Sequence, residues 1–259
     1  LTDPVVGLNM GQTAENLAWR FGINRQQMDS YSVQSHLRLS AAMEAGHLNE
    51  IEDIYDKSGN VYDADDGVRP DSSMEKIAKL KPFFDKPYGK VTPANSSQIT
   101  DGASSLLLAC EDAIKKYGLT PLAKLHPAQW AGLDPAQMGL GPAHAIAETL
   151  KYHHLIMENI DFWEINEAFA AQVQACVMAL NDARYCQDEL GLLKEVGEIP
   201  YEHLNVDGGA IALGHPVGSS GARIVLHLAR VLKRENANKG IASLCIGGGQ
   251  GGAMLVEAV

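Results

Sequence analysis

The sequence has few cysteines and no long apolar run. Its four cysteines, Cys110, Cys176, Cys186 and Cys245, form no CxxC pair and show no spacing typical of secreted proteins. We therefore expect reduced thiols in a cytoplasmic protein and exclude a disulfide scaffold. No apolar stretch approaches the roughly 18 residues that a membrane span requires, so we expect no membrane partner.

Basic residues are scarce relative to acidic ones. The chain has 21 Lys and Arg against 32 Asp and Glu, a net charge of −11. This balance argues against binding to nucleic acid or to an anionic membrane surface. A small phosphorylated ligand needs only a few cations, and one dense basic run is present: Arg69, Lys76, Lys79 and Lys81. A solvated surface is the simpler interpretation of that run.

Low-complexity segments are also absent. Hydrophobic residues make up 46% of the chain and charged residues 20%, which is typical of a folded globular protein. A length of 259 residues permits one large domain or two moderate ones. The N-terminus, Leu1-Thr2-Asp3-Pro4, has no signal-peptide features and no initiator Met, so we interpret it as a cut end.

The first ninety or so residues carry helical patterns. Residues 12–21 are amphipathic, and Asn24 is a predicted N-cap of a long helix that ends near Ala45 and is closed by Gly46. No strand is predicted in this part. Residues 81–93 hold three prolines and little periodicity, which is typical of a domain boundary.

Strand and helix patterns alternate after that boundary, which predicts an α/β layer. Residues 205–221 form a glycine-rich loop, and Ser219 or Ser220 is the predicted cap of the helix that follows. The predicted strands are residues 103–109, 123–133, 160–165, 241–246 and 253–259, and the predicted helices are residues 111–117, 143–152, 167–180 and 221–234.

Three segments place a polar side chain at the end of a predicted element. They are residues 166–170, residues 208–218 and residues 245–249. Strand ends and tight glycine loops are where a rigid scaffold presents side chains and backbone N–H groups to a ligand. These segments are therefore the candidate functional site.

Each polar residue of these segments also has a purely structural interpretation. Asn166 is equally well explained as the N-cap of its helix. Cys245 alone would be a core thiol, but the three glycines that follow it leave N–H groups available for an oxyanion. His215 lies between Gly214 and Pro216 in a loop where a merely packed histidine is unusual, so a functional role is favoured.

Other chemistries fit the sequence less well. Residues 247–252 satisfy G-x-G-x-x-G, but a strand rather than a helix is predicted after them, so dinucleotide binding is rejected. Ser219 and Ser220 lie near His215 without a G-x-S-x-G elbow, which argues against a serine hydrolase. His153 and His154 lack a partner at ligand spacing, so no metal site is predicted.

The three segments occur in the order and at the spacing found in the thiolase family, which the chain resembles over nearly its whole length. The resemblance also includes residues 9–16, 89–97 and 101–103. Thiolases have a longer N-terminal region, and that region carries the cysteine that becomes acylated. No cysteine precedes Cys110 in this sequence. We therefore expect this chain, taken alone, to lack the nucleophile and to be inactive.

The resemblance implies an α/β fold with two layered α/β/α halves and a helical loop domain inserted in the first half. By this resemblance, residues 1–91 are the helical loop domain, residues 92–121 the end of the N-terminal half and residues 122–259 the C-terminal half. The first half would be incomplete. Partners of the 103–109 strand would then be missing, which leaves unpaired edges and exposed apolar surface.

Catalytic roles follow from the resemblance residue by residue. His215 would activate the missing nucleophilic thiol and help to hold the thioester oxygen. Cys245 would be the second, acid/base cysteine, which protonates the carbanion in thiolysis and abstracts the α-proton in Claisen condensation. Asn166 would hold a water in one oxyanion hole, and the backbone N–H of Gly247 would form part of the other.

The resemblance also implies contacts with CoA. The matching positions are Arg69 and Phe84 at the nucleotide end, Met10 and Ser97 along the pantetheine, and Met138, Ala168 and Phe169 near the thioester. The sequence departs from the family at Lys76, where many thiolases have a serine, and at Asn9, where a histidine is common. Residues 181–204 are also longer than in short-chain biosynthetic members.

The sequence therefore predicts an acyl-CoA C-acyltransferase, acting on acyl-CoA and CoA as substrates without a tightly bound cofactor, and a homodimer or homotetramer when full length. A ketoacyl synthase relative is disfavoured because those enzymes pair two histidines with the nucleophile, and Cys245 stands where the second would be. The remaining alternative is a non-catalytic protein of thiolase ancestry that binds acyl-CoA or lipid.

Overall fold

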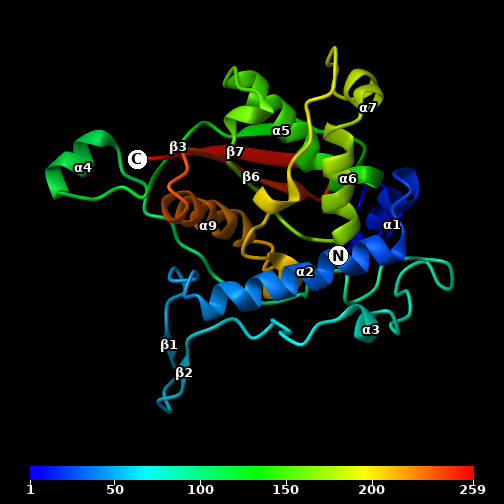
Figure 1. Cartoon of the computed structure of the whole chain (residues 1–259), viewed down its shortest axis with the longest axis horizontal. Helices are drawn as coiled ribbons and strands as arrows, with labels where there is room; N and C mark the ends of the chain where they lie inside the picture. The colour runs from blue at the N-terminus through cyan, green and yellow to red at the C-terminus, as the bar shows by residue number, and fades with distance from the viewer.

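A mixed five-stranded sheet with helices on both faces is the centre of the computed structural model, which describes all residues 1–259 (Figure 1). The strand order is β3-β7-β6-β5, and β4 also pairs with β7. Strand β5 is parallel to β6, and the other pairs are antiparallel. The strands are β3 (Ala123–Leu125), β4 (Gln129–Gly132), β5 (Phe162–Ile165), β6 (Lys239–Ile246) and β7 (Gln250–Ala258).

Alternation along β6 and β7 directs side chains to both faces of the sheet. Ile241 and Leu255 join the larger core cluster, with residues of α5 (Gly141–Tyr152) and α6 (Ala170–Leu180). Ala242 and Val256, one residue on, join a second cluster with α9 (Ser220–Arg234). Because successive side chains of a strand point to opposite faces, the two clusters lie on opposite sides of the sheet.

The predicted helices of the N-terminal part are confirmed. Asn9 is the N-cap of helix α1 (Met10–Arg20) and Asn24 is the N-cap of helix α2 (Arg25–Glu44). Both caps form reciprocal hydrogen bonds with a glutamine three residues on. The C-cap of helix α2 is Ala45, and Gly46 follows with φ +70°. A short helix, α3 (Met74–Ile77), follows later.

The prediction that this part lacks strands is wrong. Strands β1 (Ile54–Tyr55) and β2 (Val61–Tyr62) pair as a hairpin that projects from the molecule (Figure 1). The Asp56 carboxylate accepts hydrogen bonds from the backbone N–H groups of Ser58 and Asn60 and so holds the turn. Two-residue strands are too short to show an alternation of apolar and polar residues in the sequence. The hydrogen bonds from the Asp56 side chain to the backbone of the turn stabilise this hairpin instead.

The predicted strand at residues 103–109 is also wrong. These residues form no ladder, and Leu107 and Leu108 are 86% and 72% exposed. A strand needs a neighbour to satisfy its N–H and C=O groups, and no strand of this chain lies beside the segment. Helix α4 (Glu111–Tyr117) follows as predicted and buries none of its residues. The expected exposed apolar surface is therefore present here.

The C-terminal elements agree with prediction apart from their boundaries. His126 and Pro127 interrupt the predicted 123–133 strand, which becomes β3 and β4, and α6 begins at Ala170 rather than Glu167. The loop 205–221 contains one helical turn, α8 (Ala210–Leu213). The remaining elements are η1 (Pro135–Leu140), η2 (Met157–Asn159), α7 (Ala183–Asp188) and η3 (Tyr201–His203).

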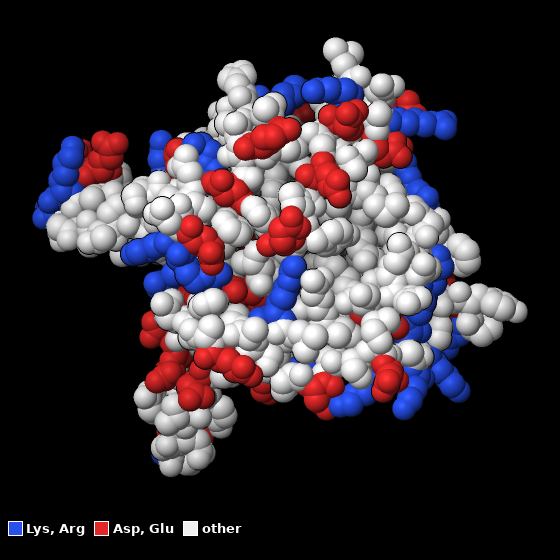
Figure 2. Space-filling view, viewed as in Figure 1, with Lys and Arg blue, Asp and Glu red and all other residues white.

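Charged side chains of both signs are spread over the face drawn in Figure 2. Acidic side chains gather where the β1–β2 hairpin leaves the body, and basic side chains gather around α3. No helix has both the length and the apolar character needed to cross a membrane.

Candidate active site

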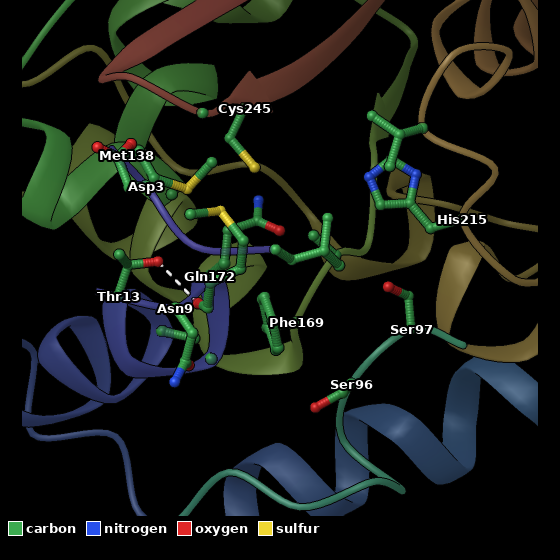
Figure 3. A pocket seen from close by; sticks show the side chains of 18 of the residues that line it. Asp3, Asn9, Thr13, Ser96, Ser97, Met138, Phe169, Gln172, His215 and Cys245 are labelled. Atoms are coloured by element: carbon green, nitrogen blue, oxygen red, sulfur yellow. Dashed lines mark hydrogen bonds between the residues drawn. The ribbon is translucent and has the colours of Figure 1, made fainter. Parts of the chain in front are cut away.

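A cavity of about 840 Å³ lies at the end of β6 (Figure 3). Its wall combines the first residues of the chain, the start of α1, residues 96–100, η1, the segment before α6 and the loop that precedes α9. Segments far apart in the sequence therefore meet at one place. Thirteen of the 28 lining residues are hydrophobic, so the cavity suits a ligand with a substantial apolar part.

Most of the predicted site residues line this cavity: Met10, Phe84, Ser97, Met138, Ala168, Phe169, His215, Cys245 and Gly247. Asn166 lies behind the wall, in contact with His215. Arg69 is not brought to the cavity. It is exposed, and its backbone N–H donates to Nδ1 of His36 at 3.1 Å.

His215 is held at its backbone and at both ring nitrogens. Its N–H donates to the carbonyl of Gln98 at 3.0 Å, Nδ1 lies 2.6 Å from Oγ of Ser220, and Nε2 lies 3.4 Å from Nδ2 of Asn166. Burial, and secondly the positive charge of Arg223, lower the pKa of His215 below its ordinary value. The imidazole is therefore neutral near pH 7.

Cys245 enters the cavity from the end of β6, while His215 enters from the loop before α9 (Figure 3). The cysteine is buried and packs with Met138 and Ala168. Burial raises the pKa of its thiol to about 12, because a thiolate is poorly stabilised in apolar surroundings. Cys245 therefore carries its proton at neutral pH.

Asn166 follows β5 and does not cap the next helix, so the capping interpretation is wrong. The N-cap of α6 is Phe169. The backbone N–H of Asn166 donates to the carbonyl of Ser243 at 2.9 Å, which ties the residue to β6. Its Oδ1 atom is buried and has no hydrogen-bond partner in the protein. A buried amide oxygen without a partner is available to a ligand or a water.

Sequence reasoning missed the supporting residue Glu167. Its carboxylate accepts hydrogen bonds from the hydroxyls of Tyr31 and Ser35, from Nδ2 of Asn205 and from the backbone N–H of Ile211. It thereby joins α2, the segment after β5 and the start of α8. A glutamate directly after Asn166 was visible, but its partners lie 38 or more residues away.

Asp3 was also missed. Its Oδ2 accepts a hydrogen bond from the backbone N–H of Gly248 at 2.7 Å, across 245 positions of sequence. Gly248 and Gly249 have φ of +84° and +77°, a backbone conformation that glycine adopts without strain. The turn between β6 and β7 is thus held against the first residues of the chain, beside Cys245.

No group of three or more His, Cys, Asp or Glu side chains is arranged to hold a metal ion.

Residues 119–258 match the family described as "Thiolase, C-terminal domain", and residues 1–112 match "Thiolase, N-terminal domain". The chain belongs to the thiolase family. Human mitochondrial 3-ketoacyl-CoA thiolase is 40% identical over 262 residues, covering 100% of this chain and 62% of that protein. Rat mitochondrial trifunctional enzyme subunit beta is 40% identical over 250 residues, covering 96% and 52%.

Solved thiolase structures share the fold of the whole chain. The crystal structure of human mitochondrial 3-ketoacyl-CoA thiolase has a TM-score of 0.86 at 39% identity, and that of Bacillus anthracis acetyl-CoA acetyltransferase has 0.88 at 40%. Each comparison covers 100% of this chain and 62% of the other. The α/β thiolase fold predicted from the sequence is confirmed. This thiolase-family chain spans 52% to 62% of the length of these relatives.

Proposed function

We propose that the protein is an acyl-CoA C-acyltransferase that cleaves 3-ketoacyl-CoA with CoA, or runs the reverse Claisen condensation. The observation that carries the proposal is the convergence of the Cys245 thiol and the His215 imidazole on one cavity, with Asn166 behind the ring. The cavity volume, about 840 Å³, lies within the range of roughly 300–1,000 Å³ typical of small-molecule sites.

Cys245 is the proposed acid/base group. In thiolysis the bond between Cα and Cβ of the 3-ketoacyl group breaks, and the electron pair remains on Cα. The Cys245 thiol donates its proton to that carbon, and in the reverse direction the thiolate abstracts it. The raised pKa of Cys245 suits the donor role, because the thiol is fully protonated at neutral pH.

His215 is the proposed base for the thiol that carries the acyl group. A neutral imidazole accepts the thiol proton through a bare ring nitrogen. Asn166 and the backbone N–H of Gly247 are the proposed oxyanion donors, Asn166 through a water. Loss of one such donor typically lowers the rate by about 10²–10³.

None of the four cysteines fits the role of acylated nucleophile. Cys245 is the only one that lines the cavity, and its high thiol pKa makes it a weak nucleophile at neutral pH. Cys176 and Cys186 are buried outside the wall, and Cys110 is exposed at the start of α4. We therefore propose that the acyl group resides on a thiol outside these 259 residues and that the chain alone is inactive.

We propose CoA and acyl-CoA as the ligands of the cavity and no tightly bound cofactor. A related structure, human mitochondrial 3-ketoacyl-CoA thiolase in complex with CoA, has a TM-score of 0.87 and 39% identity to this chain. Met10, Phe84, Ser97, Met138, Ala168 and Phe169 are the proposed contacts. Arg69 is retained only as a candidate contact outside the cavity wall.

The organisation of the chain remains part of the proposal. We propose a helical loop domain at residues 1–91, the end of an N-terminal half at residues 92–121 and a C-terminal half at residues 122–259. The change from the helical N-terminal part to the five-stranded sheet supports this division. A homodimer or homotetramer and a cytoplasmic location remain predictions, and named relatives include both mitochondrial and bacterial proteins.

Calorimetric titration of the 259-residue chain with CoA and acetyl-CoA tests the proposed ligand. We expect binding, and we expect Ser97→Trp to abolish it because the larger side chain would occupy the cavity that Ser97 lines. Ser58→Trp, in the exposed turn of the β1–β2 hairpin, is the matched control and should bind normally. Equal binding by both variants would place the ligand elsewhere. Binding without acetoacetyl-CoA thiolysis by the full-length protein would favour the non-catalytic alternative.

A further inference from the structure

Ser220 lies fully buried at the first position of α9, with its hydroxyl against His215. The distance from its Oγ to Nδ1 of His215 is 2.6 Å. Serine hydroxyls at the start of a helix often accept a hydrogen bond from a backbone N–H of the first turn. The N-cap of α9 is Ser219, and no side chain forms such a cap bond here. A buried hydroxyl is costly without a partner, and here the partners are His215 and the carbonyl of Pro216.

The carbonyl of Pro216 accepts from the backbone N–H groups of Ser219 and Ser220 and from both serine hydroxyls, so the tautomer of His215 is inferred from the direction of the Ser220 hydrogen bond. The Ser220 hydroxyl has one proton, and its Oγ lies 3.1 Å from the carbonyl oxygen of Pro216, which can only accept. With that proton on Pro216, Oγ presents lone pairs to His215. Nδ1 must then be the ring nitrogen that carries the proton of the neutral imidazole.

The opposite side of the ring supports the same assignment. Nδ2 of Asn166 lies 3.4 Å from Nε2 of His215, and an amide nitrogen donates but does not accept. A proton on Nε2 would face the amide N–H groups of Asn166. A bare Nε2 instead accepts from them. The two contacts therefore agree on one tautomer.

We propose that Ser220 is a positioning residue that holds His215 as the Nδ1–H tautomer, so that the Nε2 lone pair is the basic atom of the site. The inference that this lone pair serves catalysis rests on the proposed function, whereas the tautomer itself does not. Serine brings no negative charge, unlike the aspartate that orients a catalytic histidine in serine proteases. It fixes the ring without raising its basicity, which fits the lowered pKa of His215.

The chain offers a matched control in the preceding residue. The Ser219 hydroxyl also donates to the carbonyl of Pro216, at 3.2 Å, but forms no hydrogen bond with His215. Ser219→Ala therefore removes a hydroxyl from the same turn without touching the ring. Ser220→Thr keeps a hydroxyl at the position that contacts Nδ1.

Long-range ¹H–¹⁵N correlation spectra of the 259-residue chain labelled with ¹⁵N-histidine report the tautomer directly, without substrate. Spectra of His215→Gln identify the His215 resonances. We expect the Nδ1–H form in the unmodified chain, in Ser219→Ala and in Ser220→Thr, and a substantial Nε2–H population in Ser220→Ala. An Nε2–H form in the unmodified chain, or a tautomer unchanged in Ser220→Ala, would overturn the proposal. The first of these outcomes needs no variant, so a folding defect cannot hide it.

Turnover by the full-length protein tests the catalytic consequence. We expect Ser220→Ala to lower kcat for acetoacetyl-CoA thiolysis at least about tenfold, with KM little changed, and Ser220→Thr to recover most of it. If Ser220→Ala shifts the tautomer of His215 but leaves kcat unchanged, Ser220 does not contribute to catalysis. If the tautomer of His215 depends on Ser220 but the protein binds no CoA, the proposed function is overturned and the role of Ser220 in setting the tautomer stands.

Discussion

Burial shifts the pKa values of Cys245 and His215, which both line the cavity, in opposite directions. It raises the pKa of the Cys245 thiol to about 12 and lowers the pKa of the His215 imidazole. In both cases the low dielectric disfavours the charged form. Both groups are therefore neutral at pH 7, one with a proton to give and the other with a lone pair to receive one.

If the proposed function holds, the pH dependence of thiolysis by the full-length protein should follow from these shifts. Protonation removes the His215 lone pair, so kcat/KM should fall as pH drops through the lowered pKa of His215, below its ordinary value of 6.5. Cys245 keeps its proton well above neutral pH, so it should contribute no alkaline loss up to about pH 10. Steady-state rates measured across pH test both limbs. An alkaline limb near pH 8 that disappears in Cys245→Ser would contradict the assignment.

Substitution of His215 and of Cys245 tests the same two assignments. In the full-length protein, His215→Ala and Cys245→Ser should each lower kcat by roughly 10²–10⁴-fold, the usual contribution of one acid/base group. Calorimetric binding of CoA to the same variants is the control and should change little. If CoA binding is lost to the same extent as turnover, the residues serve binding rather than proton transfer.

The β6–β7 turn is the element on which the cavity depends most directly. A Cβ added to Gly249 would lie 2.2 Å from the carbonyl oxygen of Leu133, whereas one added to Gly247 meets no atom within 4 Å. Gly249 also has φ of +77°. The two glycines therefore have different tasks: Gly249 permits the turn, and Gly247 leaves room beside the cavity.

Alanine substitutions should separate these tasks. Gly249→Ala should lower the free energy of unfolding by about 1–3 kcal/mol because of strain and the clash with Leu133. Gly247→Ala should change it by less than about 0.5 kcal/mol. Urea denaturation of both variants gives the comparison, and equal losses of stability would show that the turn is not strained at Gly249.

Helix α9 contributes a second titratable element through His227. Its Nδ1 lies 2.6 Å from Glu50 and its Nε2 lies 3.1 Å from Asp207. Burial alone would lower the pKa of His227, but hydrogen bonds to Asp207 and Glu50 raise it to about 9. The folded-state pKa thus exceeds the unfolded value of about 6.5, so this stabilisation is complete below pH 6.5 and is lost as pH rises toward 9.

The corresponding test is a comparison with His227→Gln. At pH 6 the variant should be less stable by about 3 kcal/mol, and the difference should narrow steadily between pH 6.5 and 9. Free energies of unfolding from urea titrations at each pH provide the measurement. A difference that is constant across this window would mean that His227 is not charged in the folded protein.

Across the whole chain, the elements whose signals lie in a short stretch of sequence could be predicted. The elements that depend on a contact with a distant segment could not. The helices that begin at Asn9 and Asn24 carry their caps in sequence, and the β6–β7 hairpin carries its glycines. The 103–109 segment has the composition of a buried strand, but this depends on a neighbour that the chain does not provide.

The candidate site divides in the same way. His215, Cys245 and Asn166 stand in distinctive local patterns, and the structure brings them together. The roles of Asp3 and Glu167 depend on contacts across most of the chain, which periodicity and motif spacing do not encode. Ser220 was predicted only as a helix cap, because a cap and a histidine partner look alike in sequence.

Exposure along residues 99–121 predicts where the molecule is first cut. Ile99 and Leu107 are both 86% exposed, and α4 buries nothing. Brief treatment with subtilisin should cleave within this segment and leave a resistant C-terminal fragment that contains the five-stranded sheet. Mass spectrometry identifies the cuts. Early cleavage between α5 and β7, with residues 99–121 intact, would contradict the proposed domain division.

The proposed function requires that this chain supplies the acid/base groups of a C-acyltransferase but not the acylated thiol. The most direct test is intact and peptide mass spectrometry of the folded 259-residue chain after incubation with acetyl-CoA and acetoacetyl-CoA, alongside calorimetric binding of the same ligands. We expect binding with no acyl adduct on Cys110, Cys176, Cys186 or Cys245. A specific, turnover-competent adduct on Cys245 would contradict it and make Cys245 the nucleophile.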